Sequence, residues 1–181
     1  MKKLGIIAAI FVVLGTVNAS AQGTFKPAER VYTKTSDYVK SFFNGETPKK
    51  ATVWVIGDLR DNITEVLNGA DSTPVRYRYW RDGGRTLWVL ESVARTMPIT
   101  AGVVVENGEI LDISVLVYRE NRGYEVQARN HRVQYVGAVL KDSNTLSNPI
   151  NGISGSTLSV NSMKRMARIA LLLHNDVTSD S

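Results

Sequence analysis

Hydrophobic and polar residues alternate along the middle of the chain in a pattern that predicts β-strands. The alternating segments are rich in β-branched and aromatic residues and are bounded by turn-forming residues, as strands usually are. They are 51–56, 75–80, 86–90, 99–105 and 109–117. Asp82-Gly83-Gly84 separates the second segment from the third, and Asn107-Gly108 separates the last two. Both are strong turn signals between neighbouring strands, so we expect two β-hairpins.

A helical spacing of apolar residues replaces this alternation in three places. Residues 36–43 predict a short helix that ends at Asn44-Gly45, and Asp61 is placed to cap a second helix that ends at Gly69. Residues 159–174 carry a broad apolar stripe and a basic opposite face, which is typical of an amphipathic helix packed on a core.

Shorter elements fall between the second hairpin and the last helix. Val126 predicts the start of another short strand, and Val133, Tyr135 and Val136 predict the apolar side of a helical turn that stops at Gly137. Hairpin-connected strands bracketed by helices indicate an α+β single domain. We expect a mostly antiparallel twisted sheet built from hairpins, flanked by helices, with a C-terminal amphipathic helix.

The first 21 residues follow a different pattern. A basic head at Lys2-Lys3 precedes an apolar run and an Ala19-Ser20-Ala21 site, which is the layout of a cleaved signal peptide. We therefore expect a signal peptide over 1–21, a folded domain over 22–175 and a flexible tail over 176–181. The mature protein is then periplasmic or otherwise extracytoplasmic; an uncleaved membrane anchor is the alternative.

Composition narrows the chemistry of the 181-residue chain. The formal net charge of +5 falls to +3 without the two lysines of the signal peptide, and the basic residues are scattered, so no nucleic acid is expected as a partner. The chain has no cysteine and two distant histidines, which argues against thiol chemistry, iron–sulfur clusters and a metal site. Any redox chemistry must therefore come from an organic cofactor.

The segment before the last predicted helix carries the strongest functional signal. It reads Asn151-Gly152-Ile153-Ser154-Gly155-Ser156-Thr157-Leu158-Ser159. Free backbone N–H groups and the positive end of the helix dipole attract phosphate, and glycines and hydroxyls allow it to approach. Ordinary helix capping is the alternative. A serine hydrolase is disfavoured because a strained elbow needs glycine where Ser156 stands.

Ser154-Gly155-Ser156-Thr157 resembles the S-G-A-T motif of the FMN-binding domain family, found in the periplasmic subunits of the sodium-pumping NADH:quinone reductase and of the Rnf complex. Further matches are the paired strands around Asn107-Gly108, an E-T-P-G-like loop at residues 120–124 and an aromatic-x-Gly turn at residues 135–137. Asn151 departs from the aspartate that the family motif usually has. The resemblance covers roughly residues 80–168.

The resemblance implies a cofactor and its attachment. FMN would be joined through its phosphate to Thr157 by a flavin transferase, and the ring would lie near the loop at 120–124. The implied cofactor-binding residues are Asn151, Gly152, Ile153, Ser154, Gly155, Ser156 and Thr157, with Glu120, Gly123 and Tyr124.

The implied function is that of an exported electron-transfer flavoprotein with redox partner proteins at or near the membrane. No general acid–base pair and no nicotinamide-binding pattern accompany the segment, so a stand-alone enzyme is less expected than a carrier. Two alternatives stay open: a flavin-free envelope structural or adaptor protein, and a periplasmic enzyme with non-covalent FMN.

Overall fold

Six strands form one antiparallel sheet in the computed structural model, which describes residues 29–141 and 145–179. The predicted signal peptide at 1–21 lies outside the described residues. The sheet order is β1-β6-β5-β4-β3-β2. The strands are β1 (Arg30–Val31), β2 (Ala51–Trp54), β3 (Arg76–Asp82), β4 (Arg85–Val93), β5 (Pro98–Glu106) and β6 (Glu109–Tyr118).

The two predicted hairpins form the centre of this sheet. Gly83 and Gly84 connect β3 to β4, and Asn107 and Gly108 connect β5 to β6. Asn107 and Gly108 have φ of 51° and 85°, the left-handed conformation that a two-residue hairpin turn requires at both positions. The antiparallel α+β fold predicted from the alternating segments is confirmed.

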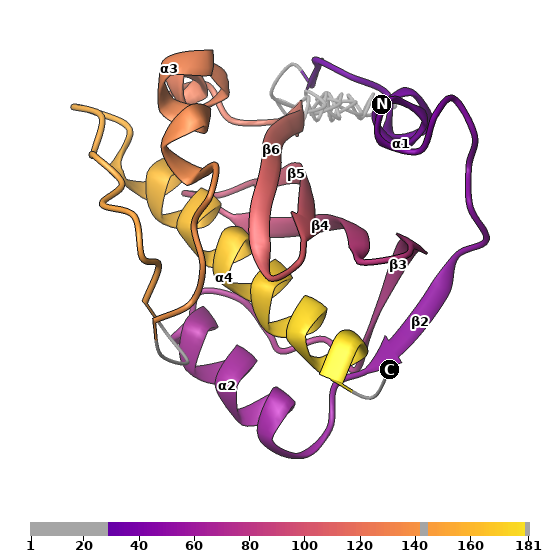
Figure 1. The fold of residues 1–181 in the computed structure, drawn as a ribbon. Helices are drawn as coiled ribbons and strands as arrows, with labels where there is room; N and C mark the ends of the chain where they lie inside the picture. The colour runs from indigo at the N-terminus through magenta and orange to yellow at the C-terminus, as the bar shows by residue number, and fades with distance from the viewer. Residues whose placement is uncertain (1–28, 142–144, 180–181) are drawn as a thin grey trace, which may run out of the picture.

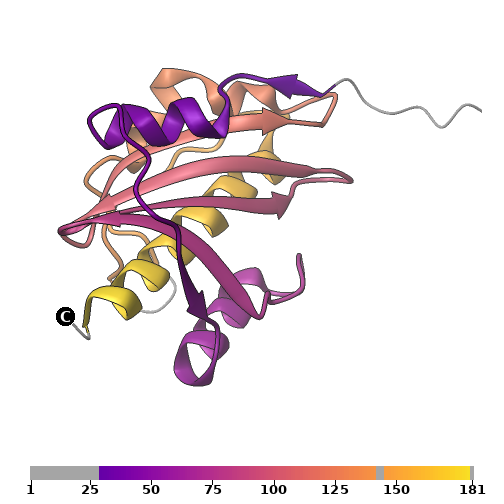
Figure 2. The same cartoon turned by 90° about the vertical axis from the view of Figure 1, so that its right-hand side faces the viewer.

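Helices cover the two faces of the sheet (Figure 1). Helix α4 (Thr157–Ser179) crosses one face over β4 and β5, with α2 (Gly57–Leu67) beside it. Helix α1 (Thr35–Phe42) lies on the opposite face, as the rotated view shows (Figure 2). The larger apolar core lies under α4 and α2, and a smaller one lies under α1. None of the described helices has the length and apolar character needed to span a membrane.

Three predicted boundaries or elements are wrong. Helix α2 begins at Gly57, four residues before the predicted cap Asp61, because buried Leu59 extends its apolar stripe by one turn. Val126 lies in the 3₁₀ helix η1 (Tyr124–Gln127) and not in a strand. Helix α4 runs from Thr157 to Ser179, two residues earlier and five residues later than the predicted helix over 159–174.

The predicted turn at 133–137 is also only partly right. The helix α3 (Arg129–Arg132) leads into the 3₁₀ helix η2 (Val133–Tyr135). Tyr135 is fully buried, but Val133 and Val136 are nearly half exposed. The apolar side predicted for this turn therefore reduces to one aromatic side chain.

Candidate functional site

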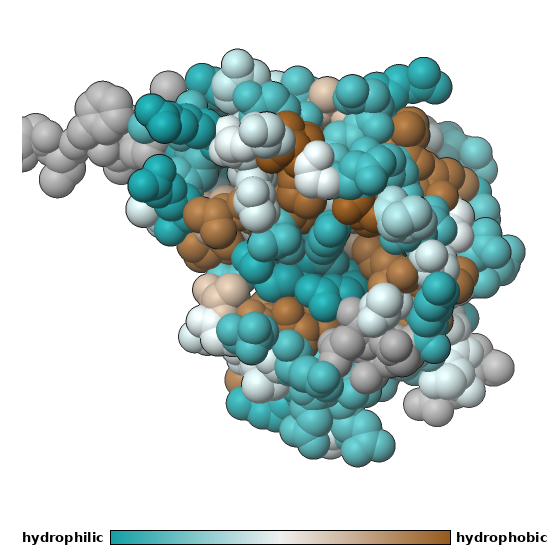
Figure 3. All heavy atoms as spheres, turned by 90° about the vertical axis from the view of Figure 1, so that its left-hand side faces the viewer, coloured by the Kyte–Doolittle hydropathy of each residue, from teal (hydrophilic) through white to brown (hydrophobic). Residues whose placement is uncertain are grey.

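The start of α4 lies beside an open cavity of about 780 Å³. Its walls are the turn between β4 and β5, the loop after β6 and the first turn of α4. The lining residues are Ala94, Arg95, Thr96, Glu120, Asn121, Arg122 and the run 155–159. The face that carries the start of α4 is hollowed, with hydrophilic side chains at its centre and hydrophobic ones around it (Figure 3). The volume lies within the range of small-molecule sites, about 300–1,000 Å³.

A tight turn leads the chain into α4. The N–H of Ser156 donates to the carbonyl of Ile153 over 2.9 Å, and Gly155 lies between them with φ of 79°. A positive φ at the third position of such a turn favours glycine. A Cβ on Gly155 would meet no other atom within 4 Å, so its conformation and not crowding requires glycine here.

The first turn of α4 presents backbone donors without acceptors. The first helical hydrogen bond joins the N–H of Val160 to the carbonyl of Ser156 over 3.0 Å. No described residue accepts a hydrogen bond from the N–H of Thr157, Leu158 or Ser159. Open N–H groups and the helix dipole together create a place for an anion at this end.

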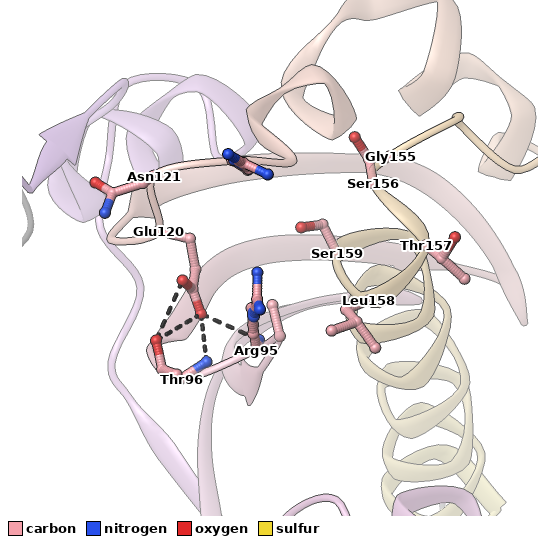
Figure 4. Close-up of a pocket in the computed structure, with 11 residues that line it drawn as sticks. Arg95, Thr96, Glu120, Asn121, Gly155, Ser156, Thr157, Leu158 and Ser159 are labelled. Atoms are coloured by element: carbon pink, nitrogen blue, oxygen red, sulfur yellow. Dashed lines mark hydrogen bonds between the residues drawn. The ribbon is translucent and has the colours of Figure 1, made fainter.

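The four hydroxyls around this turn are of two kinds. Ser156 is buried and donates to Glu125 Oε2 over 2.8 Å, and Ser159 is buried with its Oγ 2.9 Å from Tyr118 Oη. Ser154 and Thr157 are exposed. Figure 4 shows Ser159 pointing toward the cavity and Thr157 on the outer side of the helix turn. Of the hydroxyls on α4 at this site, Thr157 is thus the accessible one.

Glu120 organises the wall opposite α4. Its Oε1 accepts the backbone N–H groups of Arg95, Thr96 and Met97 over 3.0, 2.5 and 2.7 Å, as Figure 4 shows in part. Burial alone would raise the pKa of Glu120, but the hydrogen bonds from Thr96, Met97 and Arg95 outweigh it and lower that pKa. Glu120 therefore acts as an ionised clamp on the β4–β5 turn.

Gly123 brings the loop after β6 against α4. Its φ is 86°, and a Cβ there would lie 2.3 Å from Ser159 Oγ and 2.9 Å from Tyr118 Oη. Tyr118 Oη also donates to the carbonyl of Arg122. The absence of a side chain at Gly123 therefore lets the loop pack closely against the helix.

Two cationic side chains line the cavity. Arg95 comes from the β4–β5 turn and Arg122 from the loop after β6. Both are exposed. In Figure 4 the guanidinium of Arg95 points into the space between Glu120 and the start of α4. Together with the open N–H groups, these cations make the cavity suited to a negatively charged group.

The structure brings only some of the predicted site residues together. Glu120 and the run 155–157 line the cavity, whereas residues 151–154 precede it and Gly123 is buried behind it. Tyr124 is 43% exposed, with the Arg30 guanidinium 5.0 Å from its ring centroid, and does not line the cavity. Sequence reasoning missed Arg95, Arg122, Tyr118 and Glu125, because nothing in their local sequence marks them.

A comparison with known families covers the part of the chain that holds this site. Residues 95–172 match the family model of the FMN-binding domain. This part of the chain is an FMN-binding domain. No curated protein and no solved structure matches the chain significantly.

The FMN-binding domain contains almost the whole cavity. It begins at Arg95, in the turn clamped by Glu120, and ends in α4 at Leu172. Strands β1 to β4 and helices α1 and α2 lie before it and extend the sheet. Of the lining residues only Ala94 lies outside it.

The donors in the cavity fit the phosphate of FMN. Three open N–H groups and the two cations can bind a phosphate, and the exposed Thr157 hydroxyl lies on the outer side of the same helix turn. Support for a flavin ring is smaller and comes from Ala94 and Leu158, the latter 50% exposed. The site is thus more fully formed for the charged end of the cofactor than for its ring.

Proposed function

We propose that the protein is an exported electron carrier that holds FMN by its phosphate at the start of α4. The observation that carries the proposal is the set of open N–H groups of residues 157–159 beside the exposed Thr157 hydroxyl, inside an FMN-binding domain. Bound FMN would supply one- and two-electron redox chemistry. The signal-peptide pattern at 1–21 supports export.

The attachment is covalent in this proposal. A flavin transferase takes FMN from a flavin dinucleotide: a bond forms between Thr157 Oγ and the FMN phosphorus, the phosphoanhydride bond from that phosphorus breaks, the nucleoside monophosphate leaves, and the hydroxyl proton passes to solvent. The protein gains the mass of FMN less one water. Burial and hydrogen bonding of Ser156 and Ser159 support Thr157 as the acceptor.

The side chains around the cavity bind and position the cofactor in this proposal. Arg95 and Arg122 offset the phosphate charge, and the Glu120 clamp keeps Arg95 on the cavity wall. Permanent attachment suits a compartment without a free cofactor pool. Electrons would come from and pass to redox partner proteins at or near the membrane, which would approach the open mouth of the cavity.

Intact mass after co-production with a flavin transferase tests the attachment. The wild-type protein should gain one FMN less one water, and Thr157→Ala should lose this gain completely. Ser154→Ala is the matched control, since it removes the neighbouring exposed hydroxyl and should leave the gain unchanged. Thr157→Ser keeps a hydroxyl and should retain some modification.

Three other outcomes contradict parts of the proposal. Modified Thr157→Ala protein would place the attachment elsewhere. Yellow protein at unmodified mass that releases FMN on unfolding would indicate non-covalent FMN. Colourless, unmodified wild-type protein, made beside a control protein that the same transferase modifies, would favour a flavin-free envelope protein.

A further inference from the structure

Ser156 occupies the position of a helix N-cap but does not cap the helix. A serine immediately before the first helical residue ordinarily accepts a hydrogen bond from the second or third N–H of the helix. Those are the N–H groups of Leu158 and Ser159, and no described residue accepts from either. The Ser156 hydroxyl donates to Glu125 Oε2 over 2.8 Å, and in the orientation that this bond holds, its oxygen accepts neither N–H.

The backbone around Glu125 is held firmly against the start of α4. Glu125 lies in η1 between Gly123, which contacts Ser159, and Val126, which is fully buried in the core. The N–H of Ala128 closes the 3₁₀ turn by donating to the Glu125 carbonyl over 3.0 Å. The carboxylate therefore reaches Ser156 from a fixed support, 31 residues away along the chain.

We propose that Glu125 is a positioning residue that keeps Ser156 from capping α4 and so leaves the N–H groups of its first turn open to the phosphate. This inference rests on the proposed function. It assigns Ser156 and Glu125 a joint role: the serine is a potential internal competitor of the phosphate, and the glutamate holds it away.

Our inference predicts that removing Glu125 weakens phosphate binding, whereas simple electrostatics predicts that it strengthens it. A carboxylate beside an anion site repels the anion, so losing the charge should strengthen phosphate binding. Glu125→Gln and Glu125→Ala lose the same charge, but only glutamine keeps an oxygen that can accept from Ser156. The difference between the two variants therefore reports the side-chain contact to Ser156 with the effect of charge removed.

Amide hydrogen exchange tests the first half of the inference without any flavin. The Ser159 or Leu158 amide should exchange about fivefold more slowly in Glu125→Ala than in Glu125→Gln, the size expected when a serine N-cap forms. Ser156→Ala added to both variants removes the hydroxyl that would form this cap, and should abolish the difference. Equal exchange in Glu125→Ala and Glu125→Gln would overturn the inference.

Titration with FMN and with riboflavin tests the second half. FMN should bind Glu125→Ala about fivefold more weakly than Glu125→Gln, because binding must first break the new cap. Riboflavin lacks the phosphate and should bind the two variants equally. The added Ser156→Ala change should restore equal FMN binding, which a general loss of folding could not do.

The outcomes separate this inference from the proposed function. FMN binding by the wild type with no difference between the glutamine and alanine variants overturns the role of Glu125 alone. Failure of the wild type to distinguish FMN from riboflavin contradicts the phosphate site, and with it both proposals. Tighter FMN binding by Glu125→Ala than by Glu125→Gln would overturn the inference directly.

Discussion

The two ends of α4 both carry polar groups next to tight turns, but they meet the rest of the protein differently. At the start, the N–H groups of residues 157–159 have no acceptor among the described residues, and Thr157 is exposed. Near the end, His174 is 2% exposed and both ring nitrogens have partners. Its Nδ1 lies 2.8 Å from Thr86 Oγ1, and its Nε2 accepts the N–H of Gly108 over 3.1 Å.

We call the start of α4, with residues 157–159, the proposed binding end, and the part around His174 the structural end. Thr86 Oγ1 also accepts the indole N–H of Trp88 over 2.9 Å, so the contacts of His174 join β4, the β5–β6 hairpin and α4 in one closed network. Buried polar groups are stabilising when their partners are supplied from within the protein. At the start of α4 the described residues supply no such partners, and our proposal assigns that role to the phosphate of FMN.

Gly123→Ala should have the largest effect on the binding end. The change forces a left-handed φ on alanine and places its Cβ against Ser159 and Tyr118, so the free energy of unfolding should fall by about 3 kcal/mol. FMN binding should fall with it, since the loop can no longer lie on α4. Chemical denaturation and flavin titration measure both.

Gly155→Ala is the matched control for this change. Gly155 has a similar φ of 79°, but its Cβ would meet nothing within 4 Å, so only about 1 kcal/mol should be lost. Equal losses in the two variants would show that crowding between the loop and α4 contributes nothing.

His174→Ala should reveal the structural end. Removing the ring leaves the Gly108 N–H without its acceptor and should lower the free energy of unfolding by about 2 kcal/mol beyond the effect of lost volume. His131→Ala removes an equally buried ring whose Nδ1 has no partner among the described residues, and should cost less. FMN binding by His174→Ala should stay unchanged; a large loss would mean that the two ends of α4 are coupled.

Lowering the pH should reduce the contribution of His174 to the free energy of unfolding gradually. Burial and then the positive charge of Arg81 lower the pKa of His174, so its protonation favours the unfolded chain. Stability from this histidine is present above pH about 6.5 and declines below it, by at most about 1.4 kcal/mol per pH unit. His174→Ala should flatten that part of a stability–pH profile; an unchanged profile would contradict the assignment.

Glu120 should change the free energy of unfolding in a lower pH range than the histidines do. Its pKa is lowered in the folded protein, so the stability it contributes is present above the ordinary glutamate pKa of about 4.3 and is lost as the pH falls further. Glu120→Gln should remove this step while leaving the decline below pH about 6.5. Stability–pH profiles of the two variants, His174→Ala and Glu120→Gln, therefore separate the contribution of His174, near the end of α4, from that of Glu120, beside its start.

Local patterns were reliable where neighbouring residues determine the structure. Asn107-Gly108 predicted a hairpin because few residues adopt its left-handed conformations, and the apolar stripe predicted α4. The start of α2 was predicted four residues late, at the capping residue Asp61, although Leu59 lies four residues before Ile63 and continues the same apolar stripe. The family resemblance implied Glu120 only as a cofactor-binding residue, and its hydrogen bonds to a turn 23 to 25 residues away are not visible in any local pattern.

The sequence by itself determined the two central hairpins, the main helices and the place of a glycine- and hydroxyl-rich segment before the last helix. These features depend on backbone conformations and periodicities that act over a few residues. Only the tertiary structure decided which hydroxyls are free. Ser156 and Ser159 are occupied by Glu125 and Tyr118, 31 and 41 residues away, and Thr157 between them is left exposed, because burial depends on which distant segments pack together.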